Sequence, residues 1–384
     1  YEVMPWPDRI YQGLYRIAGT DQKERIPRSY STQMQVMINT LNDIRTSDKQ
    51  ISGTHGIGVL MANSLMFQRF PDHNGYDDPQ FSSFYGQTLP LLKRGIPVEL
   101  VHMENTPFKD TFNGLQVLVM SYSNMKPMKS EYHNYLADWV KKGGTLVYCG
   151  EDVDPYQTVL EWWNTEGNAY KAPSEHLFEA MGLSRNPGDG TYRFGKGTVI
   201  VMREDPKHFV LKGGNDRKYF ETIASAYESK TGKKIEIKNN FMVERGPYTI
   251  AAVMDESSSK EPLKLSGLYI DLFDKDLPVL TVKQINPGEQ GYLYDLNKVS
   301  GKVKAKVLCG ASRIYDEKVG KQSYSFVAKS PLHTTNVSRV LLPRKPGKVL
   351  VNGKAEQPEW DESSKTLLLS FENDPAGVNV SIEW

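Results

Sequence analysis

The sequence has few of the features that mark several classes of protein. Only two of its 384 residues are cysteines, Cys149 and Cys309. This excludes a disulfide-rich scaffold and cysteine-based zinc modules. The formal net charge is only +1 and no strongly basic patch stands out, so we expect no nucleic-acid partner. No apolar run approaches the roughly 18–20 residues that span a bilayer, so we expect no membrane partner.

A start signal is also missing, because the chain opens at Tyr1 with neither a methionine nor a recognisable signal peptide. We therefore expect a fragment of a longer protein, with part of the function encoded upstream. The length predicts two or three domains, at roughly 100–200 residues per domain. Three segments with different patterns follow one another along the chain.

Residues 1–50 read as a strand, a long loop and a helix. The strand is Tyr1–Met4, the loop covers residues 8–28, and the helix follows Pro27. Ser29 or Ser31 is the expected N-cap. The apolar face of this helix is predicted from residues at helical spacing: Met34, Met37, Leu41 and Ile44.

Residues 51–235 alternate strands and helices. The predicted strands are Ile57–Met61, Pro97–His102, Val117–Tyr122, Thr145–Cys149 and Thr198–Met202. The predicted helices are Pro79–Arg94, Lys129–Lys142, Asp154–Asn164, Ser174–Met181 and Asp216–Ser229. The strands are continuous apolar runs, which is typical of a parallel sheet covered on both faces. We predict a doubly wound, flavodoxin-like α/β domain.

Residues 236–384 lose the helical periodicity and carry short β-rich runs separated by turn signals. Strands at this spacing favour an antiparallel β-sandwich domain. Asn352-Gly353 is the strongest single hairpin signal.

Cys149 ends a predicted parallel strand, the position at which amidotransferase-like domains keep a nucleophile. A thiolate needs a basic neighbour, whereas Glu151 and Asp152 follow here. We therefore interpret Cys149 as a buried structural residue.

The loop after Cys149, residues 150–155, carries three carboxylates, which suggests a calcium or sugar site. The simpler interpretation is a solvated loop in which Asp154 caps the next helix.

Three further patterns are weak. The glycine-rich turn at residues 53–58 precedes a strand rather than following one, which disfavours nucleotide binding. The seven histidines show no zinc-binding spacing, so we expect neither metal nor cofactor. Trp162-Trp163 could stack on a sugar, but packing is the favoured interpretation.

Glu2 is the candidate catalytic carboxylate. It lies on a strand that ends in a Pro-Trp-Pro loop, and retaining glycosidases place their carboxylates at the ends of barrel strands. Trp6, Asp8 and Arg9 would form the substrate-binding subsite beside it. A second carboxylate would have to come from sequence before Tyr1, and the alternative is an ordinary edge carboxylate.

The order of a barrel-like tail, an α/β domain and a β domain resembles the glycoside hydrolase family 42 β-galactosidases. The stretches that carry the resemblance are Ile57–Arg69, Trp139–Pro155 and Leu177–Leu183. The segment Gly267–Phe273 also looks like large bacterial glycosidase-like proteins. The resemblance implies that residues 1–50 are the last strand and helix of a (β/α)8 barrel. It also implies that residues 51–235 are a trimerisation domain related to glutamine amidotransferases but without their chemistry. The β domain of residues 236–384 is longer than the family's, so membership in another, related family is the alternative.

The resemblance predicts a non-catalytic C-terminal part of a bacterial glycoside hydrolase-like protein, which oligomerises through its α/β domain and helps to shape a carbohydrate site. The parent would cleave glycosidic bonds in the periplasm or outside the cell, with the cytoplasm as the alternative. Two other functions stay open. One is a stand-alone carbohydrate-binding or scaffold protein, with Tyr292, Tyr294, Tyr315 and Tyr324 as candidate exposed rings. The other is an active hydrolase centred on Cys149.

Overall fold

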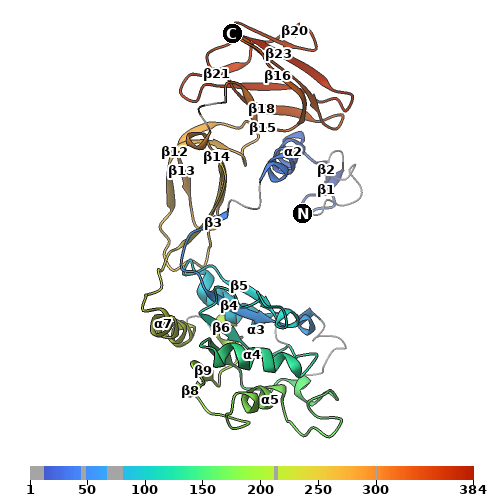
Figure 1. The fold of residues 1–384 in the computed structure, drawn as a ribbon. Coiled ribbons are helices and arrows are strands. Elements are labelled where there is room, and N and C mark those ends of the chain that lie inside the picture. The colour runs from blue at the N-terminus through green and yellow to red at the C-terminus, as the bar shows by residue number, and fades with distance from the viewer. Residues whose placement is uncertain (1–12, 45–48, 67–80, 212–214, 300, 302) are drawn as a thin grey trace. The chain divides into compact units, whose positions relative to one another are not determined.

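The computed structural model describes residues 13–44, 49–66, 81–211, 215–299, 301 and 303–384 (Figure 1). The chain divides into two compact units. The α/β unit comprises residues 52–241 and 254–260, and the β-rich unit comprises residues 1–51, 242–253 and 261–384. The prediction of a mixed α/β chain with many antiparallel sheets is confirmed. Within the described ranges, no helix combines the length and apolar character needed to cross a membrane.

A six-stranded sheet with the order β5-β4-β6-β7-β9-β8 forms the centre of the α/β unit. Its strands are β4 (Ile57–Met61), β5 (Glu99–His102), β6 (Val117–Met120), β7 (Thr145–Cys149), β8 (Gly190–Phe194) and β9 (Gly197–Met202). The first five in the spatial order run parallel, and β8 is an antiparallel edge strand that the sequence did not predict. Buried apolar residues such as Val147 and Leu146 point to opposite faces, so each face carries its own core.

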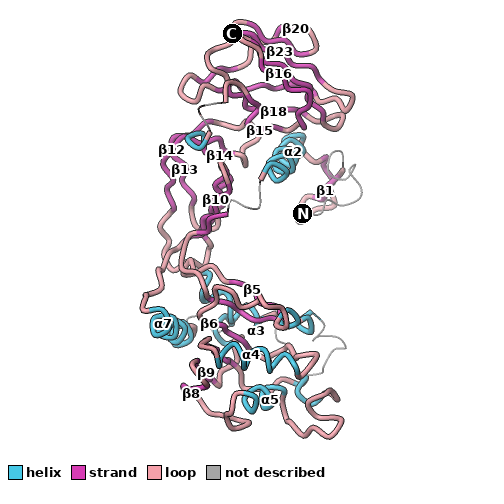
Figure 2. Tube along the Cα trace, in the orientation of Figure 1, coloured by secondary structure: helices cyan, strands magenta, loops and turns pink. Residues whose placement is uncertain are grey.

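Helices cover both faces of this sheet (Figures 1 and 2). On one face lie α3 (Ser82–Leu92), α6 (His208–Leu211) and α7 (Arg217–Thr231). On the other lie α4 (Glu131–Lys141) and α5 (Pro173–Ala180). Two short 3-10 helices, η1 (Asn63–Met66) and η2 (Met103–Asn105), follow β4 and β5.

The predicted helix over Asp154–Asn164 is wrong. Only the 3-10 helix η3 (Pro155–Thr158) forms, and irregular turns follow it. Side chains there bond to the local backbone, as where Asn164 Nδ2 donates to the Val159 carbonyl at 2.8 Å. Such bonds compete with the helical ladder.

Three antiparallel sheets and one hairpin build the β-rich unit. The first sheet, in the order β13-β12-β14-β11-β10-β3, comprises β3 (Lys49–Ile51), β10 (Asn240–Arg245), β11 (Tyr248–Val253), β12 (Leu263–Asp271), β13 (Val279–Ile285) and β14 (Gln290–Asp295). The 3-10 helix η4 (Leu296–Lys298) follows β14.

The other two sheets share one buried apolar core, to which Leu367 and Ile382 contribute from opposite sides. One, in the order β15-β18-β22-β21, comprises β15 (Lys306–Gly310), β18 (Thr335–Leu341), β21 (Glu359–Asp361) and β22 (Thr366–Glu372). The other, in the order β16-β17-β23-β19-β20, comprises β16 (Arg313–Val319), β17 (Ser323–Lys329), β19 (Lys348–Val351), β20 (Lys354–Ala355) and β23 (Val378–Glu383). The hairpin predicted at Asn352-Gly353 is confirmed by the pairing of β19 with β20.

The N-terminal part differs from its prediction in two respects. A hairpin of β1 (Leu14–Arg16) and β2 (Lys23–Arg25) lies where we predicted a loop. The helix after Pro27 is confirmed as α2 (Arg28–Asp43), but it has no side-chain cap and Leu41 is exposed. Its buried face is mostly polar: Ser31, Thr32, Gln35, Val36 and Thr40.

Candidate functional site

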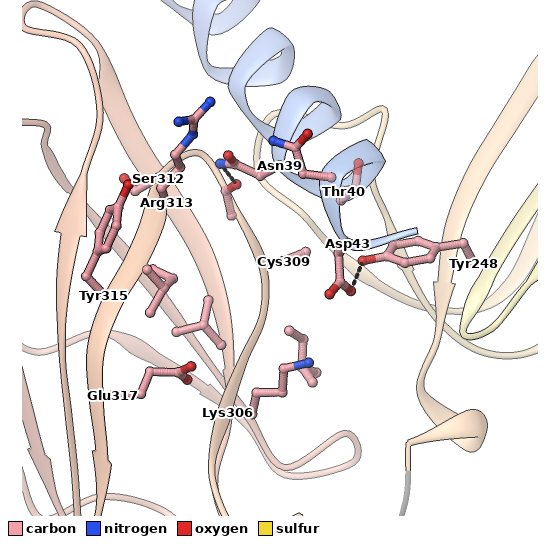
Figure 3. Close-up of a pocket in the computed structure, with 15 residues that line it drawn as sticks. Asn39, Thr40, Asp43, Tyr248, Lys306, Cys309, Ser312, Arg313, Tyr315 and Glu317 are labelled. Atoms are coloured by element: carbon pink, nitrogen blue, oxygen red, sulfur yellow. Dashed lines mark hydrogen bonds between the residues drawn. The ribbon is translucent and has the colours of Figure 1, made fainter. Parts of the chain in front are cut away.

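A cavity of about 510 Å³ in the β-rich unit is the candidate functional site. It lies between the C-terminal half of α2, the start of β11 and the strands β15 and β16 (Figure 3). Its volume falls within the roughly 300–1,000 Å³ range of small-molecule sites. The polar side chains that line it are Asn39, Thr40, Asn42, Asp43, Tyr248, Lys306, Ser312, Arg313, Tyr315 and Glu317.

Hydrogen bonds rather than apolar packing hold α2 against its neighbours. Asn39 Nδ2 donates to the Gly310 carbonyl at 2.9 Å, and Thr32 Oγ1 donates to the Thr335 carbonyl at 3.0 Å. Val36 supplies the helix's buried apolar contact. These contacts set the position of the final turn of α2, from which Asp43 projects into the site (Figure 3).

Both carboxylates of the cavity are oriented by buried tyrosines. The Tyr248 hydroxyl donates to Asp43 Oδ2 at 2.8 Å, and the Tyr324 hydroxyl donates to Glu317 Oε1. Burial, reinforced by the neighbouring carboxylate, raises the pKa of both tyrosines, so both remain neutral donors at physiological pH. The cavity therefore presents two pre-oriented carboxylate acceptors.

Donors and one aromatic ring complete the lining. Lys306 and Arg313 balance the formal charge of Asp43 and Glu317. The ring of Tyr315 is 43% exposed, and Lys329 Nζ lies 5.4 Å from its centroid. A neutral ligand with many hydroxyl groups matches this lining, because each hydroxyl both donates and accepts hydrogen bonds. The carboxylates, cations and amides of the cavity would supply the complementary groups.

Cys149 is an inert residue in this structure. It is fully buried at the end of β7, and its Sγ lies 4.0 Å from Met202 Sδ. Burial is the main cause that raises the pKa of its thiol far above the ordinary value. A neutral, inaccessible thiol is a poor nucleophile, so the interpretation of Cys149 as a structural residue is confirmed.

The carboxylates that follow Cys149 are largely engaged within the protein. Asp152 Oδ2 accepts from Arg203 Nη1 and Ser174 Oγ, each at 2.7 Å. The buried carboxylate of Asp154 caps η3 by accepting from Tyr156 N at 3.0 Å, and it pairs with Lys126. No group of acidic, histidine or cysteine side chains among the described residues is arranged to hold a metal ion.

The other sequence candidates have mixed outcomes. Glu2, Trp6, Asp8 and Arg9 lie outside the described residues. Trp163 is buried, and Trp162 Nε1 donates to the Pro127 carbonyl at 2.9 Å, as expected for packing residues. Of the four tyrosines proposed as exposed, only one is exposed and lines the cavity, Tyr315. The other three are buried: Tyr292, Tyr294 and Tyr324.

Sequence inspection missed most of the cavity, because its residues come from segments more than 200 positions apart. One usable signal was present in β16. Arg313 and Tyr315 alternate along this strand and share one face with period two, and Glu317 joins the lining after an irregularity in the pairing between Tyr315 and Lys318.

Solved structures that resemble this chain include glycoside hydrolase family 42 β-galactosidases. The β-galactosidase from Bacillus circulans sp. alkalophilus is 11% identical, with a TM-score of 0.41, 68% of this chain and 43% of that chain covered. For the family 42 enzyme Gan42B from G. stearothermophilus these values are 12%, 0.37, 63% and 40%. For the β-galactosidase from the haloarchaeon Halorubrum lacusprofundi they are 13%, 0.37, 66% and 41%.

This chain thus spans less than half the length of each of these enzymes. No family model and no curated protein matches it.

Proposed function

We propose that this chain is a non-catalytic part of a bacterial glycoside hydrolase-like protein that binds carbohydrate and self-associates. In this proposal residues 1–50 are a barrel remnant, residues 51–235 a flavodoxin-like association domain, and residues 236–384 a β-sandwich domain. The α/β domain mediates contacts between copies. The carbohydrate site is the cavity bounded by α2, β15 and β16.

The lining of that cavity is the observation that carries the proposal. It pairs two carboxylates with two cations, adds the amides of Asn39 and Asn42, and places the exposed ring of Tyr315 at one side. Directional polar groups recognise sugar hydroxyls, and an aromatic ring packs on the apolar CH face of a pyranose. A charged ligand is disfavoured because the formal charges of the lining cancel.

The absence of a reactive centre in the described part of the chain supports a binding role. Cys149 is buried and protonated, and its Sγ lies 4.0 Å from Met202 Sδ. In the cavity, Asp43 and Glu317 both accept from tyrosine hydroxyls. Each of these carboxylates is thus engaged within the protein.

A stand-alone carbohydrate-binding protein is the second candidate function. The observation that favours it is that every residue lining the cavity belongs to the β-rich unit. Such a site needs neither a catalytic barrel nor the α/β unit. The full-length gene product distinguishes the two candidates: a preceding barrel with carboxylates on two strand ends supports the enzymatic parent.

A glycan array probed with the purified chain tests the proposal, followed by incubation of the best ligand with the same protein. We expect binding in the micromolar range and no release of reducing sugar. Binding to no glycan on the array would contradict carbohydrate recognition. Hydrolysis of the bound glycan or of aryl glycosides would contradict the non-catalytic role.

A further inference from the structure

The antiparallel strand β8 leaves one edge of the α/β sheet without a partner strand among the described residues. Its neighbour on the other side is β9, joined to it by the two-residue turn Gly195-Lys196. An open edge exposes backbone donors and acceptors to any strand that matches it. The geometry of β8 shows which residues carry those free groups.

Thr191 and Arg193 present their backbone groups outward. Phe194 and Gly197 flank the two-residue turn and so form a hydrogen-bonded pair, as do Tyr192 and Val199. The backbone N–H and C=O groups of the alternate residues, Thr191 and Arg193, then point away from β9. Thr198, which lies opposite Arg193 on β9, supports this assignment. Its backbone N–H donates to the Gly144 carbonyl at 3.1 Å rather than to β8.

The charged residues beside this edge would attract those of a second copy related by a two-fold rotation. Asp189 precedes β8 and Arg193 lies near its end, and both are exposed on the same face as Thr191. If Thr191 pairs with Thr191 of an antiparallel second copy, Asp189 of each copy lies opposite Arg193 of the other. The side chain of Asp189 is 55% exposed in its contact with Lys218, whose Nζ lies 3.6 Å away.

A groove of about 530 Å³ lies along the same face of β8 and β9. The floor is formed by Thr191, Arg193 and Ile200. The α7 residues that line the wall include Lys218, Glu221, Thr222 and Ser225. Arg193 Nη1 donates to Thr198 Oγ1 at 3.2 Å across it.

We propose that β8 pairs with β8 of a second copy of this chain, which extends the sheet across a two-fold axis at Thr191. Each copy offers the same surface, as a closed dimer requires. The two Asp189–Arg193 contacts select this register. This inference rests on the self-association in the proposed function and adds its surface, register and symmetry.

Backbone and charge variants of the full chain test the pairing by sedimentation equilibrium. Thr191→Pro removes an outward N–H without touching the bonds between β8 and β9, and Thr191→Val is its matched control. Arg193→Asp replaces the attraction by repulsion. Lys109→Asp is the control, because Lys109 is an exposed residue of the same unit that lies outside β8. We expect dimers for the wild type and both controls, and a dimer dissociation constant at least about tenfold higher for the two test variants.

A disulfide at the two-fold axis tests the register. Directly opposed strand residues lie about 5.5 Å apart at Cα, within the range that a disulfide spans. Under mild oxidation we expect Thr191→Cys to form covalent dimers and Lys109→Cys to stay monomeric. A monomeric wild type, Thr191→Pro as dimeric as Thr191→Val, or equal cross-linking of the two cysteine variants would overturn the inference. Glycan binding is read separately, since the cavity lies in the β-rich unit.

Discussion

The hydroxyl of buried Tyr248 donates a hydrogen bond to Asp43 Oδ2 at 2.8 Å, and this contact orients a carboxylate of the cavity. Tyr248→Phe removes only the hydroxyl. We expect the free energy of unfolding to fall by about 1 kcal/mol. Glycan affinity should fall roughly fivefold, because Asp43 loses its fixed orientation.

Calorimetric titration and urea denaturation measure the two effects. Tyr294→Phe is the matched control, since its ring packs edge-to-face on Tyr248 at 5.3 Å but does not line the cavity. Equal affinities for Tyr248→Phe and the wild type would remove Asp43 from the binding site.

The ion pair of Lys126 and Asp154 yields a prediction about stability. Nζ lies 2.9 Å from Oδ2, and both side chains are buried. Burial lowers the pKa of Lys126 although the Asp154 carboxylate opposes this shift. Lys126→Met leaves Asp154 as an uncompensated buried charge, so we expect a loss of about 3 kcal/mol.

Urea denaturation of the full chain measures this loss. Lys129→Met is the control, because Lys129 is exposed and its contact with Glu131 spans 3.4 Å. We expect it to stay within about 0.5 kcal/mol of the wild type. Similar midpoints for the two variants would show that the buried pair contributes little.

Gly86 allows the close approach of α3 to the segment before α6. A Cβ at this position would lie 1.8 Å from the Pro206 carbonyl oxygen. Gly86→Ala must displace backbone, so we expect destabilisation by about 3 kcal/mol. Gly188→Ala meets no atom within 4 Å and should be nearly neutral, and thermal unfolding compares the two.

The environment of His133 leads to a prediction about how the stability of the protein depends on pH. Its Nδ1 lies 2.8 Å from His176 Nδ1, and its Nε2 lies 2.5 Å from the Tyr122 hydroxyl. Burial, followed by the influence of His176, lowers the pKa of His133 well below its ordinary value. In the unfolded chain His133 binds a proton near pH 6.5, whereas in the folded protein it stays neutral at that pH. The free energy of unfolding therefore falls as the pH falls below about 6.5.

The expected loss is at most about 1.4 kcal/mol per pH unit from this group. Urea denaturation between pH 7 and pH 5 measures it. His133→Gln should flatten the dependence. Parallel curves for the variant and the wild type would contradict the assignment to His133.

The elements that were predicted best from the sequence are those whose pattern of apolar residues follows their burial. The continuous apolar run Thr145–Cys149 matches β7 at both ends, because every residue of a central parallel strand is buried. The face of α2 was mispredicted for the converse reason. That helix docks through Thr32 and Asn39 to backbone carbonyls, and an apolar pattern does not record hydrogen bonds.

The edge strand β8 and the cavity required the tertiary structure. β8 is a five-residue strand in which exposed and half-buried residues alternate, so it lacks the continuous apolar run by which the other strands of this sheet were predicted. In the cavity, Asp43 and Glu317 are brought together by a fold that joins segments far apart in the chain. Only the alternation of Arg313 and Tyr315 pointed locally to this site.

Calorimetric titration of the best array glycan into the wild type, Tyr315→Ala and Tyr135→Ala tests the central claim most directly. Tyr315 lines the cavity and Tyr135 is a similarly exposed tyrosine on α4, at 43% and 40% exposure. The account predicts wild-type affinity for Tyr135→Ala and affinity at least about tenfold weaker for Tyr315→Ala. Equal affinity of the two variants would contradict a carbohydrate site in this cavity.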